Sequence, residues 1–260
     1  MNARRAVFLR EMGCTLWRQR PEPSVHGENE NAPSPEEQSA QCVAMPEEIN
    51  AAPAQPSPPN AEAVSPAIAR QAGIARMDWP GLAAAVRDCR ACVLCQRRKQ
   101  AVLGVGDPDA DWLFIGEGPG AEEDARGEPF VGQAGKLLDA MLASIGLKRG
   151  ENVYIANAVK CRPEGNRTPH HEEMETCRPF LRRQIALVRP KLIVLLGKAA
   201  VRSVLGEERA LAAMRKKRFQ YESVPVLVTY HPAYLLRNLP DKAKAWEDLC
   251  FARRIFREIG

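Results

Sequence analysis

The chain has 260 residues, of which 45% are hydrophobic and 27% are charged, and its formal net charge is +5. No run approaches the roughly eighteen consecutive apolar residues that span a bilayer, and the basic start lacks the apolar region of a signal peptide. These features argue against a membrane protein and favour a cytoplasmic one, in which the eight cysteines point to metal ligation or core packing rather than to disulfides.

The N-terminal part of the chain differs in composition from the rest. Residues 21–66 contain ten of the 21 prolines and no aromatic residue, a mixture that buries too little apolar surface to offset chain entropy. An amphipathic pattern over residues 4–18 suits a short docking helix or, equally, a weakly ordered terminus. We expect residues 1–77 to be a largely disordered, proline-rich extension and residues 78–260 to be the folded domain. The extension carries a charge of −2, which leaves +7 for the domain and suits a polyanionic partner such as nucleic acid.

Helical and strand patterns alternate along the rest of the chain. Apolar spacing predicts four strands, at 111–115, 153–159, 191–196 and 226–229, with a shorter strand-like run at 219–222 and a turn at 103–108. Helices are predicted from Trp79 towards Cys89, across 137–145, at 171–188 with a kink or break at Pro179, at 198–205 and at 242–257. This alternation predicts an α/β fold: a three-layer α/β/α sandwich with a central, mainly parallel four-stranded sheet.

Polar side chains follow three of these strands. The first strand runs into the glycine-rich acidic turn 116–124, Asn157 lies near the end of the second, and His231 follows the last. The carboxyl ends of parallel strands meet at one edge of a sheet, so these groups should converge on one crevice. Taken alone, the turn is explained as an ordinary connection, Asn157 as a turn cap and His231 as a packed or solvated histidine.

Four cysteines form a second set. Cys89 and Cys92 make a CxxC pair, and fifteen residues separate Cys161 from Cys177. Four thiolates brought together could bind Zn²⁺ or hold an iron-sulfur cluster, and the spacing does not decide between these groups. Cys95 could replace Cys89 as the partner of Cys92.

Four segments together resemble the family 4 uracil-DNA glycosylases, the iron-sulfur type of the uracil-DNA glycosylase superfamily. They are Gly116-Glu-Gly-Pro-Gly-Ala-Glu-Glu-Asp124, Pro129-Phe-Val-Gly132, Asn157-Ala-Val-Lys-Cys-Arg-Pro163 and His231-Pro-Ala-Tyr-Leu-Leu-Arg-Asn238. The resemblance covers roughly residues 88–259. It implies a [4Fe-4S] cluster held by Cys89, Cys92, Cys161 and Cys177, and it does not require Cys95.

The resemblance also assigns the base pocket. It implies that Phe130 stacks on an extruded uracil, that Asn157 pairs with the polar edge of the base and that His231 lies near its O2 atom. Base flipping gives an enzyme access to an atom hidden inside a duplex. An Asn amide offers both a donor and an acceptor, which match uracil O4 and N3–H and mismatch cytosine.

Further residues are implied for catalysis and for DNA binding. Glu117 and Glu123 match acidic active-site positions of the family, and Glu123 is the stronger choice for orienting or activating water. Gly118 stands where better-known uracil glycosylases have an acid. The residues after His231 are expected to form a loop, in which Arg237 is suited to hold a phosphate and the apolar residues 234–236 are suited to wedge into the gap left by the base. Leu235 and Leu236 are equally suited to lie in the core.

We therefore expect a monomeric, monofunctional DNA repair enzyme that hydrolyses uracil from DNA in the nucleoid and leaves an abasic site. The N-terminal extension could recruit a repair or replication protein. A non-catalytic or covalently trapping uracil-DNA binder of the same superfamily is the alternative, and the plain loop 163–169 argues against it. A third reading is a zinc-stabilised nucleotide-binding module.

Overall fold

Six strands form one mixed sheet in the order β1-β3-β2-β4-β6-β5 in the computed structural model, which describes residues 65–259. The strands are β1 (Val105–Gly106), β2 (Trp112–Gly116), β3 (Val153–Asn157), β4 (Leu192–Leu196), β5 (Phe219–Tyr221) and β6 (Val224–Thr229). The four central strands β3, β2, β4 and β6 are parallel to one another, as the sequence predicts. Every residue of β2, β3 and β4 is buried, which explains their continuous apolar character.

The sheet is wider than the predicted four strands because each edge carries a short antiparallel strand. β5 coincides with the strand-like run at 219–222. β1 replaces part of the turn predicted at 103–108 and pairs Gly106 with Tyr154. A Cβ atom on Gly106 would lie 2.2 Å from the Val153 carbonyl oxygen, so the two backbones approach closely only because this residue is glycine.

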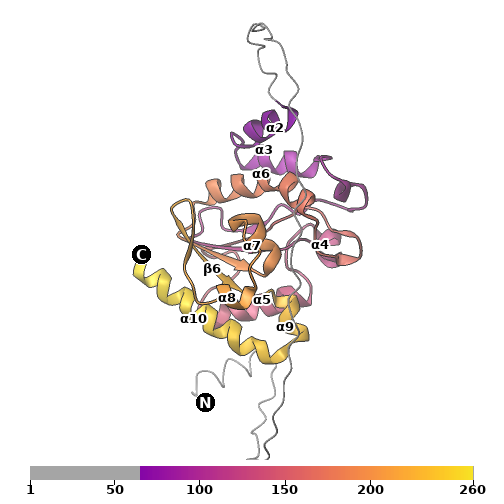
Figure 1. Cartoon of the computed structure of the whole chain (residues 1–260). Coiled ribbons are helices and arrows are strands. Elements are labelled where there is room, and N and C mark those ends of the chain that lie inside the picture. Colours follow the sequence, from indigo (N-terminus) through magenta and orange to yellow (C-terminus); the bar gives the residue numbers. More distant parts are fainter. Residues whose placement is uncertain (1–64, 260) are drawn as a thin grey trace, which may run out of the picture. The chain divides into compact units, whose positions relative to one another are not determined.

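Helices lie on both sides of the sheet, with α6 (His171–Val188) and α7 (Lys198–Leu205) on one side and α5 (Gln133–Ser144) and α10 (Lys242–Ile259) on the other (Figure 1). The helix α6 is continuous through Pro179, so the predicted division of this helix does not occur. Shorter helices are α3 (Trp79–Arg87), α4 (Ala121–Arg126), α8 (Leu211–Met214) and α9 (Pro232–Arg237), with 3-10 turns η1 (Val93–Gln96), η2 (Glu164–Asn166) and η3 (Leu239–Asp241). None of the described helices is long and apolar enough to cross a membrane.

A further helix, α2 (Pro66–Ile74), precedes the domain boundary expected at residue 78. Its Ile74 is 3% exposed, and Arg70 Nη1 donates to the Thr176 carbonyl oxygen of α6 at 2.9 Å. Arg70 also lies over the Phe180 ring. The packed part of the chain therefore includes α2. The amphipathic pattern at 4–18 and almost all of the proline-rich segment lie outside the described residues.

Candidate active site

The acidic turn after β2 is closed by the carboxylate of Glu123. Its Oε2 atom accepts from the Gly120 amide at 3.1 Å, and Oε1 accepts from the amides of Val131 and Gly132 at 2.9 and 3.0 Å. Both oxygens are therefore committed to backbone donors. This side chain joins the first turn of α4 to the loop that contains Phe130.

Phe130, Asn157 and His231 meet at the carboxyl edge of the sheet. The Phe130 and His231 rings stack with their centroids 5.5 Å apart. A Cβ atom on Gly116 would lie 2.5 Å from both the Asn157 Oδ1 atom and the Phe130 ring. The residue at the end of β2 therefore has to be glycine for the other two side chains to keep these positions, and Asn157 and His231 both lie beside Phe130 at this edge.

Asn157 presents a buried amide without a full set of partners. Its side chain is 2% exposed, and its Oδ1 atom has no hydrogen-bond partner. Its backbone is fixed by two contacts. Asn157 pairs with Gly116 of the neighbouring strand β2, and its carbonyl oxygen accepts from Lys160 Nζ at 2.7 Å. An unpaired buried amide costs free energy, so this group is prepared for a polar ligand.

His231 is the N-cap residue of α9, a short helix where the sequence predicted a loop. Its Nδ1 atom accepts from the Ala233 amide at 3.1 Å, which leaves the proton of the neutral ring on Nε2. Burial, together with the charge of Arg237, lowers the pKa of His231 from 6.5 to about 4, and Glu123 opposes this shift. The ring is therefore neutral near pH 7 and offers one N–H donor.

Glu117 differs from Glu123 in its surroundings. Burial raises the pKa of its carboxyl group, and a side-chain hydrogen bond with Thr168 partly opposes the shift. Its carbonyl oxygen accepts from the Val159 amide at 3.1 Å. A Cβ atom on Gly118 would lie 2.7 Å from the Val159 side chain, so the close approach of this turn to the segment after β3 requires glycine.

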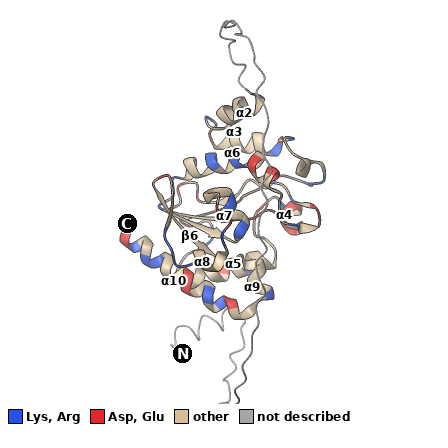
Figure 2. Cartoon of the chain, in the orientation of Figure 1, with Lys and Arg blue, Asp and Glu red and all other residues tan. Residues whose placement is uncertain are grey.

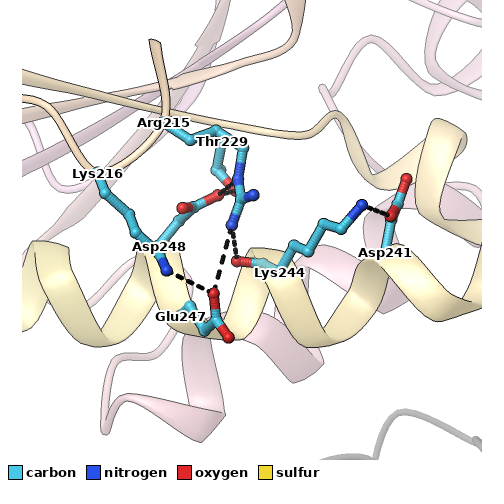
Figure 3. A network of polar contacts seen from close by, with 7 residues as sticks. All are labelled: Arg215, Lys216, Thr229, Asp241, Lys244, Glu247 and Asp248. Atoms are coloured by element: carbon cyan, nitrogen blue, oxygen red, sulfur yellow. Dashed lines mark hydrogen bonds and ion pairs between the residues drawn. The ribbon is translucent and has the colours of Figure 1, made fainter. Parts of the chain in front are cut away.

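A buried ion pair supports the segment that carries His231 (Figure 3). Arg215 Nε donates to Asp248 Oδ2 at 2.7 Å, and the Thr229 hydroxyl donates to the same oxygen at 2.8 Å. The guanidinium of Arg215 also lies over the Tyr230 ring. Thr229 and Tyr230 immediately precede His231, so α10 holds this strand end in place. This network could not be predicted from the sequence, because Arg215 and Asp248 belong to no motif and meet only in the fold.

The helix α9 places Leu235 and Leu236 in different surroundings, which the sequence did not decide. Leu235 is fully buried in the core, whereas Leu236 is 40% exposed. Arg237 is exposed at the end of the same helix. Of the two leucines, Leu236 is therefore the one whose side chain faces solvent.

Five cysteines line one cavity beside α3 and α6. They are Cys89, Cys92, Cys95, Cys161 and Cys177. Arg98 Nη1 donates to the Cys161 sulfur at 2.8 Å, and Arg70 Nη2 lies 3.7 Å from the Cys89 sulfur. Across residues 65–259, no three His, Cys, Asp or Glu side chains are already arranged to hold a metal ion.

A buried lysine borders the same cavity. Lys160 is 1% exposed, and burial lowers the pKa of its ammonium group to about 8, while the thiolates of Cys161 and Cys177 would raise it. Burial raises the pKa of the Cys177 thiol to about 12. A buried cation is stabilised by nearby negative charge, so the cavity favours an anionic occupant.

Comparisons with known proteins agree with this geometry. A family model described as "Uracil DNA glycosylase superfamily" matches residues 103–250. The type-4 uracil-DNA glycosylase of Archaeoglobus fulgidus is 45% identical over 159 residues, which are 58% of this chain and 79% of the relative. That of Thermotoga maritima is 41% identical over 179 residues, 67% of this chain and 93% of the relative. A type-5 uracil-DNA glycosylase of Pyrobaculum aerophilum is 34% identical over 149 residues, 51% of this chain and 66% of the relative.

Proposed function

The chain belongs to the uracil-DNA glycosylase superfamily and, within it, to the type-4 enzymes, and from this premise we propose that it hydrolyses the N-glycosidic bond of uracil in DNA and leaves an abasic site. The observation that carries the proposal is the unpartnered buried amide oxygen of Asn157, which lies against Gly116 next to the Phe130 ring. A flipped base needs a pocket of this kind, with an aromatic face and a polar group at its edge.

Asn157 reads the base. In the orientation that pairs with uracil, its amide oxygen accepts from N3–H and its NH₂ group donates to O4. Cytosine presents an acceptor at N3 and a donor at C4, so both contacts would become repulsive. The bond from Lys160 Nζ to the Asn157 carbonyl oxygen fixes the backbone from which the amide projects.

His231 stabilises the departing base. As the glycosidic bond breaks, negative charge develops on the uracil ring. A neutral imidazole already carries a proton on Nε2 and can donate this N–H to O2, so His231 does not have to gain or lose a proton first. The bond from the Ala233 amide to Nδ1 holds the ring in this tautomer. Phe130, stacked on His231, supplies the apolar surface for the base.

Glu117 is our choice for the carboxyl group that orients the attacking water and faces the cationic sugar. The sequence favoured Glu123, but both oxygens of that carboxylate accept from backbone amides. Glu123 instead keeps the walls of the pocket together. Gly118 has no side chain and lies close against Val159, so position 118 does not supply the acid that better-known uracil glycosylases have there.

DNA binding rests on distributed positive charge. Figure 2 shows Lys and Arg residues on α6, α7 and α10 rather than along a single helix. Arg237 would hold a phosphate, and the exposed Leu236 beside it would fill the gap left by the flipped base. We propose that the chain acts as a monomer, and that it acts in the cytoplasm at the nucleoid, where its DNA substrate would lie.

We also propose that Cys89, Cys92, Cys161 and Cys177 hold a [4Fe-4S] cluster. The donor set fits: the four sulfurs line one cavity, and Arg98, Arg70 and Lys160 place positive charge around it. When bound, the cluster would tie α6 to the loops after α3 and β3 and take no part in bond cleavage. Cys161→Ala should lower iron and sulfide content and the midpoint of thermal unfolding, whereas Cys250→Ala, on the exposed side of α10, should not. An unchanged iron content in Cys161→Ala would show that Cys161 is not a ligand of the cluster.

The function is tested with a uracil-containing oligonucleotide, an otherwise identical thymine control and a denaturing gel after alkali. We expect alkali-labile sites only in the uracil strand. A complex that survives denaturant would indicate the covalently trapping alternative, and reversible binding without cleavage would indicate the non-catalytic one. Zinc without iron in the purified protein would favour the nucleotide-binding module.

A further inference from the structure

Phe130 has a backbone conformation that is rare for an aromatic residue. Its φ angle is +56°, in the left-handed region that side chains other than glycine seldom adopt, and the residue is only 6% exposed. Such a conformation persists only where the surroundings hold it, and it is often found at functional sites. The direction of the Phe130 ring depends on this backbone.

Two charged side chains hold the peptide groups around Phe130. Glu123 accepts from the amides of Val131 and Gly132, on the C-terminal side. Arg149 holds the carbonyl groups: its Nη1 atom donates to the Pro129 oxygen at 3.0 Å and its Nη2 atom to the Phe130 oxygen at 2.8 Å. The two carbonyl groups on either side of the Phe130 Cα atom are therefore bound by one planar guanidinium.

Arg149 is itself fixed. Its Nε atom donates to Asp139 Oδ1 of α5 at 2.9 Å, and its side chain is 23% exposed. Three directed bonds on one rigid fork require the geometry of arginine, and a lysine ammonium could replace only part of it. The first turn of α5 packs directly against the Phe130 backbone, since a Cβ atom on Gly135 would lie 1.8 Å from the Phe130 carbonyl oxygen.

We propose that Arg149 is a positioning residue of the base pocket: by binding the carbonyl groups of Pro129 and Phe130 it sets the left-handed backbone that places the Phe130 ring against His231. The role in uracil recognition rests on the proposed function. The role in placing the ring stands on the contacts alone, so the two can fail separately.

The test compares Arg149→Ala and Arg149→Lys with the wild-type chain. Phe130 stacks on His231, so the ring protons of His231 have an NMR chemical shift that depends on the position of the Phe130 ring; Phe130→Leu supplies the value without the ring. We expect Arg149→Ala to move this shift towards the Phe130→Leu value, with Arg149→Lys between. The kcat/KM for uracil excision should fall about tenfold or more in Arg149→Ala, with partial recovery in Arg149→Lys.

Arg209→Ala is the matched control, because the exposed Arg209 binds the Glu207 carboxylate in the loop after α7, outside the helices assigned to DNA binding. It should change neither readout. An unaltered His231 shift in Arg149→Ala would overturn the proposal, whatever the activity does. Should Arg149→Ala fail to fold, the same comparison is made with Arg149→Lys. If the wild-type chain does not excise uracil, the proposed function fails while the NMR comparison still decides the role of Arg149.

Discussion

Asn157 combines deep burial with an unused amide oxygen, and in the proposed function a matching base recovers the free energy of that arrangement. Asn157→Asp replaces the NH₂ donor by a second acceptor, which repels uracil O4. We expect kcat/KM for uracil excision to fall roughly 100-fold, or by about 2.7 kcal/mol of transition-state stabilisation. Single-turnover kinetics would measure this loss. Asn166→Asp alters an exposed loop amide and serves as the control; equal effects of the two variants would refute base reading by Asn157.

The depressed pKa of His231 gives a second prediction, on the pH dependence of stability. Its pKa is about 4 in the folded chain against an ordinary value of 6.5, so between these limits the unfolded chain binds more protons. The free energy of unfolding should therefore rise with pH across this window and fall as the solution is acidified through it. In His231→Asn, which retains a side-chain acceptor for the Ala233 amide, this part of the slope should disappear.

Urea titrations across the same pH window would measure the slope for both proteins. The same variant should lose roughly 100-fold or more in kcat, since it lacks the imidazole donor. An identical pH slope in the two proteins would mean that His231 titrates normally in the folded chain.

The end of strand β2 is the element on which the pocket depends. Gly116→Ala would place a methyl group 2.5 Å from Asn157 Oδ1 and from the Phe130 ring. Overpacking of this kind costs about 1–3 kcal/mol of stability, and we expect kcat/KM to fall more than about tenfold because the added carbon enters the base pocket. Gly73→Ala in α2, where a Cβ meets no atom within 4 Å, should leave activity unchanged and alter stability by at most about 1 kcal/mol. Parallel chemical unfolding and excision assays would compare the two, and full activity in Gly116→Ala would place the base elsewhere.

Elements differ in how well the sequence predicts them, and the difference has a physical cause. The four parallel strands and the helix Lys198–Leu205 were predicted because their own side chains carry the apolar pattern of burial. The two-residue strand β1 was missed since it exists through backbone pairing with β3. The loop predicted after His231 is the helix α9, whose apolar residues also suit a loop that contacts DNA.

The residues of the proposed base pocket were predictable because strands β2, β3 and β6 lead into three of the motifs that carry them. Their division of labour was not. The two carboxylates, Glu117 and Glu123, have the same chemistry in the sequence, and only the backbone amides around Glu123 distinguish them. Arg149 lies in no motif, and its contacts with Phe130 arise from the fold alone.

At the scale of the whole molecule, the question is where the folded domain begins. Composition places the boundary at residue 78, because proline-rich sequence continues up to Pro66 and the short segment after it looks unexceptional. The contacts place it earlier: Ile74 is buried, and Arg70 joins the cysteine cavity to α6 through Cys89 and the Thr176 carbonyl oxygen. The helix α2 is thus part of the wall around the proposed cluster.

Two truncated chains, one beginning at Ser65 and one at Asp78, separate these boundaries. The shorter chain loses the burial of Ile74, worth roughly 2 kcal/mol, and the bonds of Arg70, worth about another 1 kcal/mol. We expect its free energy of unfolding, measured in urea, to be lower by about 2–4 kcal/mol. We also expect it to lose iron faster in air, because Arg70 no longer lies beside the Cys89 sulfur. The chain from Ser65 should match the full-length protein in uracil excision and iron content. Equal stability of the two truncated chains would instead show that the domain begins at residue 78 and that α2 does not contribute to its stability.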